Sequence, residues 1–297
     1  MADLNDYLTS RIEKVDSALD RFLPATDLPP GTVHEGMRYS IFAGGKRLRP
    51  VLTLAAAEAC GATPEQLEQA LRPACAVEIM HTYSLVHDDL PCMDDDDLRR
   101  GRPTSHKVYG EGVAVLIGDA LLTEAFTILA QTMMPPRHTL QDLILEFSHC
   151  GGSQKLIGGQ ILDLEGEQKQ LDEAGLIEIH RNKTAALLTT SLRLGGMTAD
   201  ATMEQMEALS SFGQHLGLAF QVIDDILDVT QSTEKLGKTA GKDEAVNKAT
   251  YPSILGLERS REEAQRLTQK ALSSLTPFGK DGQRLEQIAH YLLDRDY

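Results

Sequence analysis

The sequence predicts an all-α protein. Ala, Leu, Glu and Gln are abundant, aromatic residues make up 5% of the chain and Trp is absent, a composition that favours helices. Near the N-terminus, one face of a helix is indicated by apolar residues at spacings of three, one and four, namely Leu4, Tyr7, Leu8, Ile12, Val15 and Leu19. No stretch shows a sustained alternation of apolar and polar residues, so we expect no strands of consequence.

Prolines and glycines divide the chain into the expected helices. The first helix should end before Pro24, and Pro91 should stop a long helix that begins at Pro64. The expected helical segments cover about 4–19, a short stretch ending at 44–45, 50–59, 64–90, 105–134, 138–168, 172–194 (ended by the glycine pair 195–196), 201–229, 249–257, 259–274 and 282–294. Residues 231–243 are polar and glycine-rich and predict a mobile loop. Without a linker-like composition anywhere, residues 1–297 are expected to form a single domain.

The bulk composition excludes several classes of protein. A net charge of −15 and a pI of about 5.0 argue against nucleic acid as a partner, since phosphate backbones require a basic face. The N-terminus lacks the features of a signal peptide, and no uncharged apolar run approaches the roughly 18 residues of a membrane span. The cysteines are scattered, which fits a reducing compartment and not a zinc site or a disulfide framework. They are Cys60, Cys75, Cys92 and Cys150. We therefore expect a cytoplasmic protein.

The main chemical signal is an acidic stretch over residues 88–97, in which six of ten residues are aspartates and arginines follow at once. Such dense like charge needs a cation, and Mg²⁺ takes carboxylate and phosphate oxygens. Since Pro91 breaks the helix, the chain can turn and bring Asp94 back to Asp88, which makes these two the expected ligands. Asp89 and residues 95–97 would then support them or face solvent. A solvated acidic loop is the alternative, and the contiguous acids do not match an EF-hand.

A second acidic set lies in the helix expected at 201–229. Asp224 and Asp228 are four residues apart and share a helix face, with Asp225 beside them. Two carboxylates one turn apart suit a cation, although two exposed acids on an amphipathic helix would look the same.

Three basic sets accompany the acids. The stretch G-G-K-R-L-R-P at 44–50 carries three cations towards a helix start, a position that favours anions, although a solvated basic turn would fit too. It lacks the spacing of a Walker A motif. The other cations are Arg99 with Arg100, and a lysine set near the second acids that comprises Lys183, Lys238, Lys242 and Lys248. Together the acids and cations predict two anionic ligands, one bridged by metal and one held directly by cations.

These stretches carry a close resemblance to the trans-isoprenyl diphosphate synthases, most of all to bacterial farnesyl diphosphate synthases. The matching residues are G-G-K-R-L-R-P at 44–50, H-D-D-L-P-C-M-D-D-D-D-L-R-R-G-R-P-T at 87–104, G-G-Q-I-L-D-L at 158–164, K-T at 183–184 and F-Q-V-I-D-D-I-L-D at 220–228. The resemblance spans nearly the whole chain in order. It implies an all-α bundle around a central substrate cavity, with isoprenoid diphosphates as substrates and a homodimer as the assembly.

The resemblance also implies the roles of individual residues. Three Mg²⁺ ions are implied, two bound by Asp88 and Asp94 and the third by Asp224 with Asp228, and Mn²⁺ is an alternative metal. The implied catalytic set is Asp88, Asp89, Asp94, Asp224, Asp225, Asp228 and Lys183. The allylic diphosphate would contact Arg99, Lys183, Thr184, Gln221 and Lys238. Isopentenyl diphosphate would contact Lys46, Arg49, His81, Arg100 and Lys248. On its own, a lone His81 in an apolar helix would pass for a core histidine.

Product length is expected to depend on Tyr83 and Ser84, five and four residues before Asp88. A bulky Tyr83 would form the floor of the cavity and favour a fifteen-carbon product, unless it is plain core filler. The competing interpretations are a geranylgeranyl or geranyl diphosphate synthase, a terpene cyclase, and a non-catalytic acidic subunit. The basic residues at 46, 49 and 100 oppose a cyclase, which needs no isopentenyl diphosphate site, and the intact motifs oppose a non-catalytic subunit.

Overall fold

The computed structural model describes residues 2–166, 171–230 and 249–293, and helices make up most of this part. The α-helices are α1 (Ala2–Phe22), α2 (Gly31–Ile41), α3 (Leu48–Ala59), α4 (Pro64–Asp88), α5 (Ser105–Tyr109), α6 (Glu111–Leu129), α7 (Leu140–Gly151), α8 (Leu156–Gly166), α9 (Glu173–His180), α10 (Ala186–Thr198), α11 (Met203–Thr230), α14 (Tyr251–Leu255), α15 (Leu257–Ser274) and α16 (Gln283–Leu293). A π-helical turn η1 (Arg181–Ala185) joins α9 to α10, and a 3₁₀ segment η2 (Thr276–Gly282) precedes α16. The predicted all-α class is confirmed.

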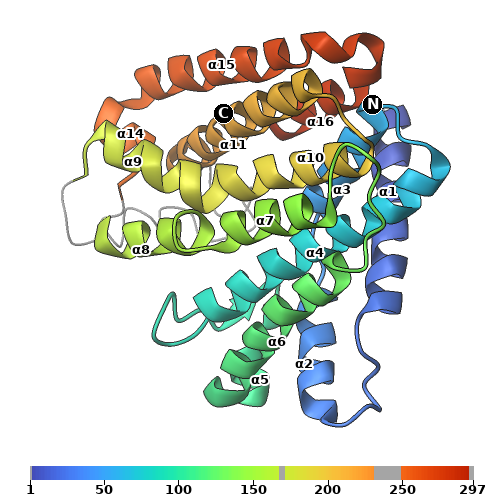
Figure 1. Cartoon of the computed structure of the whole chain (residues 1–297). Coiled ribbons are helices and arrows are strands. Elements are labelled where there is room, and N and C mark those ends of the chain that lie inside the picture. The colour runs from blue at the N-terminus through green and yellow to red at the C-terminus, as the bar shows by residue number, and fades with distance from the viewer. Residues whose placement is uncertain (1, 167–170, 231–248, 294–297) are drawn as a thin grey trace.

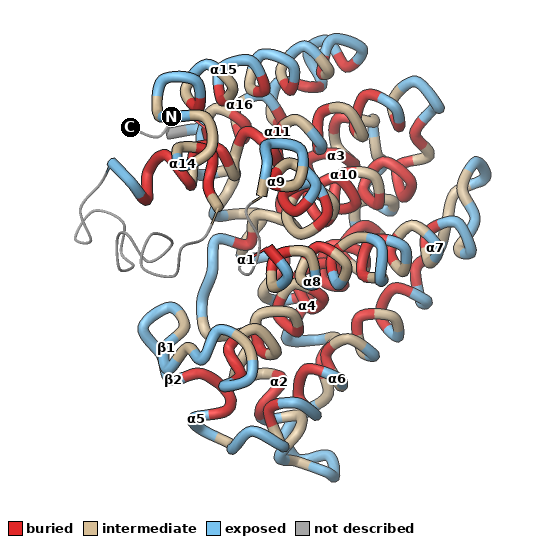
Figure 2. The backbone as a smooth tube through the Cα atoms, turned by 90° about the vertical axis from the view of Figure 1, so that its left-hand side faces the viewer, coloured by how far each residue is buried: buried red, intermediate tan, exposed pale blue. Residues whose placement is uncertain are grey.

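The helices surround a shared wall made by α3 and α10. In Figure 1 these two cross the middle of the molecule, with α11, α15 and α16 on one side and α2, α4 and α6 on the other. Helix α10 packs against both α3 and α11, and α4 packs against α3 and α6. Each of the two apolar clusters draws residues from α3 and α10, for example Leu54 in one and Leu52 in the other. The helices therefore form one bundle, whose centre is the most buried part of the chain (Figure 2).

Local sequence explains where the central helix α4 begins and ends. The Thr63 hydroxyl accepts a hydrogen bond from the backbone N–H of Gln66, the Gln66 side chain accepts one from the N–H of Thr63, and Pro64 occupies the first helical turn. The helix ends at Asp88, three residues before Pro91, which confirms the predicted stop. The first aspartates of the acidic stretch therefore lie at the C-terminal end of a long, largely buried helix.

The glycine pair 195–196 does not end a helix, contrary to the prediction. Helix α10 continues through both glycines to Thr198. A Cβ at Gly195 would overlap the backbone carbonyl oxygen of Thr53, and one at Gly196 would overlap the side chain of Leu209. The glycines thus allow α10 to approach α3 and α11 closely, and this packing offsets their low helix propensity.

Two other segments predicted as continuous helices are divided. The segment 138–168 contains α7 and α8, because the helix stops at Gly152 in an extended conformation. The segment 105–134 contains α5 and α6, which are separated by Gly110 with a φ of 84°. A two-residue hairpin, β1 (Leu98–Arg99) with β2 (Arg102–Pro103), was also not predicted.

Helix α6 is long and apolar enough to cross a membrane by length and composition alone. In the structure it packs against α4, α2 and α5, and 39% of its most apolar window is buried. Within the described ranges no other helix meets the same criteria.

Candidate active site

A cavity of about 460 Å³ opens beside the C-terminal end of α4. Its apolar wall comes mainly from α4 and α8, with Tyr83, Leu156 and Ile161 among the lining residues, and α6 and α10 add Val115 and Leu187. The rest of the lining is polar. Its charged and hydrogen-bonding side chains come from the three helices α3, α4 and α8 and from the π-helical turn η1. These are Arg49, His81, Ser84, Asp88, Gln160, Lys183 and Thr184. An elongated apolar ligand with an anionic head would match this division.

The acidic stretch turns back over the end of α4. The backbone N–H of Asp94 donates a hydrogen bond to the carbonyl oxygen of Asp88 at 2.8 Å, and the N–H groups of Met93 and Asp95 donate to Leu90 at 2.9 and 3.1 Å. The predicted reversal after Pro91 is therefore present. Burial raises the pKa of Asp88 to about 6, an effect that Lys183 opposes and Asp94 reinforces.

Asp89 is paired with the arginine that follows the acids. Its carboxylate is buried and accepts hydrogen bonds from Nε of Arg99 at 2.9 Å and from Nη2 of the same residue. Arg99 also lies 3.3 Å from Asp96. The hairpin β1–β2 holds Arg99 in place, with Arg100 and Gly101 forming its turn. Asp89 thus anchors the loop through Arg99, while Arg99, predicted to contact the allylic diphosphate, is engaged by two carboxylates here.

The basic turn at 44–50 places its three cations in different environments. Lys46 is exposed, whereas Arg47 is 3% exposed and pairs with Glu78 at 3.0 Å and Asp16 at 2.8 Å. Arg47 adopts a left-handed conformation with a φ of 47°, which breaks the chain direction just before α3. This cation therefore has a structural role, and Lys46 and Arg49 remain for a ligand.

Arg49 and Arg100 lie near each other beside His81, and neither arginine forms an ion pair with an acidic side chain among the described residues. Arg49 is half-buried, and its buried Nε atom has no hydrogen-bond partner among the described residues. Burial lowers the pKa of Arg49, Glu78 opposes this effect, and the nearby Arg100 adds to it. Burial and the charges of Arg49 and Arg100 also hold the pKa of His81 well below its usual value. Arg100 donates to the carbonyl of Gly44, which joins the two basic motifs. An anion would relieve the repulsion among these groups.

The π-helical turn η1 presents Lys183 and Thr184 to the cavity. Lys183 Nζ contacts the Asp163 carboxylate at 2.6 Å, and the Thr184 hydroxyl donates to Gln221 Oε1 at 3.2 Å. A Cβ at Gly159 would overlap the backbone of Lys183, so this glycine permits α8 to lie directly against the turn. Asp163 stood out in the sequence only as part of the motif at 158–164, and its contact with Lys183 could not be read from the sequence.

The second aspartate motif is anchored through Asp225. This buried carboxylate accepts hydrogen bonds from the Gln221 amide at 3.2 Å and from the backbone N–H of Tyr251 at 3.0 Å. His180 lies 3.7 Å from Asp225 and stacks on the Tyr251 ring. Asp228 is also buried, and Asp224 is half-buried. Asp225 thus fixes the helix end, and sequence reasoning missed both His180 and Tyr251.

The two aspartate motifs lie at helix ends on the same side of the bundle. In Figure 1 the C-terminal ends of α4 and α11 both point towards the side on which α8 and α9 lie. Lys183 interacts electrostatically with Asp88, and Thr184 contacts Gln221, so the K-T pair connects the motifs. No three His, Cys, Asp or Glu side chains within the described residues converge into a metal site. Two carboxylates with substrate phosphates remain a suitable donor set for Mg²⁺.

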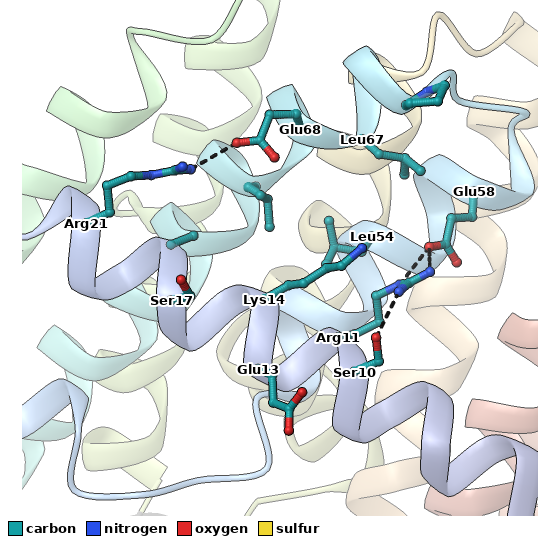
Figure 3. Close-up of a pocket in the computed structure, with 13 residues that line it drawn as sticks. Ser10, Arg11, Glu13, Lys14, Ser17, Arg21, Leu54, Glu58, Leu67 and Glu68 are labelled. Atoms are coloured by element: carbon teal, nitrogen blue, oxygen red, sulfur yellow. Dashed lines mark hydrogen bonds and ion pairs between the residues drawn. The ribbon is translucent and has the colours of Figure 1, made fainter.

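Lys238, Lys248 and the expected mobile loop at 231–243 lie outside the described residues. A second cavity, of about 560 Å³, lies between α1, α3 and α4 and contains none of the predicted site residues (Figure 3). Its arginines are already neutralised, Arg11 by Glu58 at 2.6 Å and Arg21 by Glu68 at 3.0 Å. The cavity beside Asp88 is therefore the candidate active site.

The fold and this site define the class of protein, an all-α isoprenoid synthase. Comparison with known proteins supports this class. The family model described as polyprenyl synthetase matches residues 31–291. A dimethylallyltranstransferase from Fischerella ambigua is 48% identical over 99% of this chain and 84% of the relative, and geranylgeranyl pyrophosphate synthase 3 from Arabidopsis thaliana is 47% identical over 93% and 77%.

A solved structure extends the similarity to three dimensions. The geranyltransferase from Helicobacter pylori, complexed with magnesium and isoprenyl diphosphate, is 35% identical with a TM-score of 0.82, covering 99% of this chain and 97% of that one. The chain belongs to the polyprenyl synthetase family, also known as the trans-isoprenyl diphosphate synthases, and is a prenyltransferase.

Proposed function

We propose that this chain is a farnesyl diphosphate synthase. It joins isopentenyl diphosphate head-to-tail to dimethylallyl diphosphate and then to geranyl diphosphate, giving (E,E)-farnesyl diphosphate and diphosphate. The observation that carries the product assignment is Tyr83, which lines the cavity five residues before Asp88 and is 5% exposed. A buried aromatic ring at this depth limits how far a growing apolar tail can extend.

Arg49 and His81, which line the cavity, bind isopentenyl diphosphate together with Arg100. Arg49 supplies a buried Nε that has no hydrogen-bond partner among the described residues, His81 and Arg100 supply further donors, and exposed Lys46 adds a charge. Arginine pairs with phosphate oxygens through two parallel hydrogen bonds, which fixes the orientation of the nucleophilic double bond. Lys248 is assigned to the same substrate from the family pattern.

The allylic diphosphate binds on the other side of the cavity from isopentenyl diphosphate, against Lys183, Thr184 and the aspartates. Lys183 and Thr184 line the cavity and reach its head group, and Gln221 lies behind Thr184. Arg99 completes the clamp when a diphosphate competes with Asp89 and Asp96 for its guanidinium. Lys238 is assigned here from the family pattern.

The carboxylates fit a divalent cation. Asp88 is half-buried next to Asp94, and its raised pKa reflects a negative charge that the protein alone compensates poorly. We assign three Mg²⁺ ions, two to Asp88 and Asp94 and one to Asp224 with Asp228, with Mn²⁺ as a substitute. When bound, Mg²⁺ neutralises charge on the leaving diphosphate.

The residues of the chain then promote ionisation and condensation. Lys183 and Arg99 stabilise the charge that develops on the departing diphosphate, and the apolar wall excludes water from the allylic cation. The double bond of isopentenyl diphosphate attacks C1 of this cation, and a proton then leaves to the released diphosphate. No nucleophilic Ser or Cys is required.

Product analysis tests the proposal. Purified protein is incubated with both five-carbon diphosphates and Mg²⁺, and the products are dephosphorylated and separated by chromatography. We expect a fifteen-carbon product from the native protein and longer products from Tyr83→Ala. If Tyr83→Ala still stops at fifteen carbons, Tyr83 is not the floor of the cavity.

A geranylgeranyl diphosphate synthase is the second candidate, since a relative of 47% identity carries that name. It would use the same residues and differ only in the stopping point. A twenty-carbon product from the native protein in the same chromatogram would establish it and overturn the farnesyl assignment.

We further propose that the protein is a homodimer, which buries the outer face of α6. Leu116 on this helix is 60% exposed, and the most apolar part of α6 is less than half buried in the monomer. Such a face is suited to a helix from a second copy. Light scattering after gel filtration would show a mass of two chains, and Leu116→Lys should shift it towards one.

A further inference from the structure

On the cavity wall, the ring of Tyr83 packs against the imidazole of His87. His87 lies one helical turn further along α4, and its imidazole meets the Tyr83 ring edge-on, with centroids 5.8 Å apart and an interplanar angle of 87°. Both side chains line the cavity. A change in the position of His87 would therefore change the space available to the Tyr83 ring.

Helix α6 fixes the position of His87. The Nε2 atom lies 3.0 Å from the carbonyl oxygen of Val115, and since a carbonyl only accepts, Nε2 carries the proton and donates it. The next turn of α6 holds Asp119, whose carboxylate lies 3.9 Å from the same nitrogen. The imidazole is thus tied to a backbone group that no side-chain substitution removes.

Gly118 provides the space that His87 occupies. A Cβ at this buried position would overlap Nε2, Cδ2 and Cε1 of the imidazole. The backbone of α6 therefore touches the flat ring directly, and the ring has no room to turn away from Tyr83 on that side. By contrast, Gly112 on the same helix is exposed, and a Cβ added there would meet nothing within 4 Å among the described residues, so it has no comparable packing role.

We propose that His87 is a specificity-determining residue: together with Gly118 it holds Tyr83 in the position that stops chain growth. The inference rests on the proposed function, because it requires Tyr83 to be the floor. The length of the product is then set by three residues from two helices, and α6 contributes to specificity although only Val115 of this helix lines the cavity. Loosening His87 lets the Tyr83 ring move and admits one more five-carbon unit.

The test compares product distributions for His87→Ala, His87→Gln, Gly118→Ala, Gly112→Ala and Tyr83→Ala in the full-length protein. Each is incubated with dimethylallyl and isopentenyl diphosphates and Mg²⁺, and the ratio of twenty- to fifteen-carbon product is measured at matched conversion. This ratio does not depend on the total amount of active enzyme, so a loss of stability or turnover alone leaves it unchanged.

We expect the ratio to rise about tenfold or more in His87→Ala, in the range by which apolar pockets discriminate between ligands of different size. Gly118→Ala, whose methyl group displaces the imidazole, should also change the ratio from the native value. Gly112→Ala should match the native protein. His87→Gln, whose amide can still donate to the Val115 carbonyl, should lie closer to the native ratio than His87→Ala.

Two results would overturn the inference. If Tyr83→Ala lengthens the product while His87→Ala does not, the role of His87 is refuted and the proposed function stands. If Tyr83→Ala also leaves the product unchanged, the floor itself is wrong and both fail. Should Gly118→Ala not fold, the comparison of His87→Ala with His87→Gln decides the question, since His87 is only partly buried.

Discussion

Replacement of Asp88 by asparagine should stabilise the metal-free protein while abolishing its activity. Burial raises the pKa of Asp88 from an ordinary value of 3.8 to about 6. The folded state therefore holds the proton more tightly than the unfolded chain, and the folded protein loses stability as pH rises from about 4 to about 6. Above that window the full cost of the buried charge remains, and neutral asparagine removes it.

The magnitude follows from the same pKa values. Each pKa unit is worth about 1.36 kcal/mol, which gives an upper value of about 3 kcal/mol at pH 7. Because Asp88 lines an open cavity, water screens part of its charge, and we expect about 1.5 to 3 kcal/mol. For a chain of this length, that corresponds to a rise in melting temperature of about 3 to 6 °C.

Thermal unfolding of native protein and Asp88→Asn, followed by circular dichroism from pH 4 to 8 with EDTA, measures this difference. It should be small at pH 4 and reach its full value near pH 7. Asp95→Asn, an exposed change in the same loop, should alter stability by no more than about 0.5 kcal/mol. A variant that is less stable than the native protein at pH 7, or a difference independent of pH, would refute the reasoning.

Three further predictions concern the second motif and the core. Asp224→Ala should lower turnover by orders of magnitude with an unchanged circular dichroism spectrum, and near-native activity in a radiolabelled condensation assay would contradict the metal assignment. Arg47→Met should cost about 3 to 5 kcal/mol in urea unfolding because it leaves Glu78 buried without its partner, and a loss below about 1 kcal/mol would show that the pair is dispensable. Gly195→Ala should cost about 1 to 3 kcal/mol by forcing α10 away from α3, whereas Gly112→Ala, with open space around the added methyl group, should be neutral or stabilising.

The sequence was sufficient for the fold class and for most helix boundaries, since prolines such as Pro64 and Pro91 act locally. It was insufficient where a residue acts through distant packing. From the sequence alone, Gly195 is expected to end a helix. Only the position of α3 shows why a glycine is needed inside α10. Gly110 and Gly152, by contrast, do interrupt helices, and the three cases cannot be separated by composition.

The candidate site shows the same limit. The sequence alone identified the charged residues of the site as a set, but it did not identify the side chains with which they form ion pairs. Lys46, Arg47 and Arg49 look equivalent in the sequence, yet the left-handed turn at Arg47 directs only that side chain to Glu78. Arg99 is similarly paired with Asp89, and Lys183 with Asp163, because each partner comes from a segment at least ten residues away. The roles of these residues in binding substrate stay predictions.

The π-helical turn at Arg181–Ala185 has a consequence for how this chain can change in evolution. A π turn holds one residue more than an α turn, so deleting that residue would restore regular helix locally. The deletion would also rotate everything beyond it by about 100°. Gly195 would leave the surface of α3, and the apolar faces of α10 would turn out of both clusters. The extra residue of the π turn is therefore required by the packing of α10 as well as by the position of Lys183.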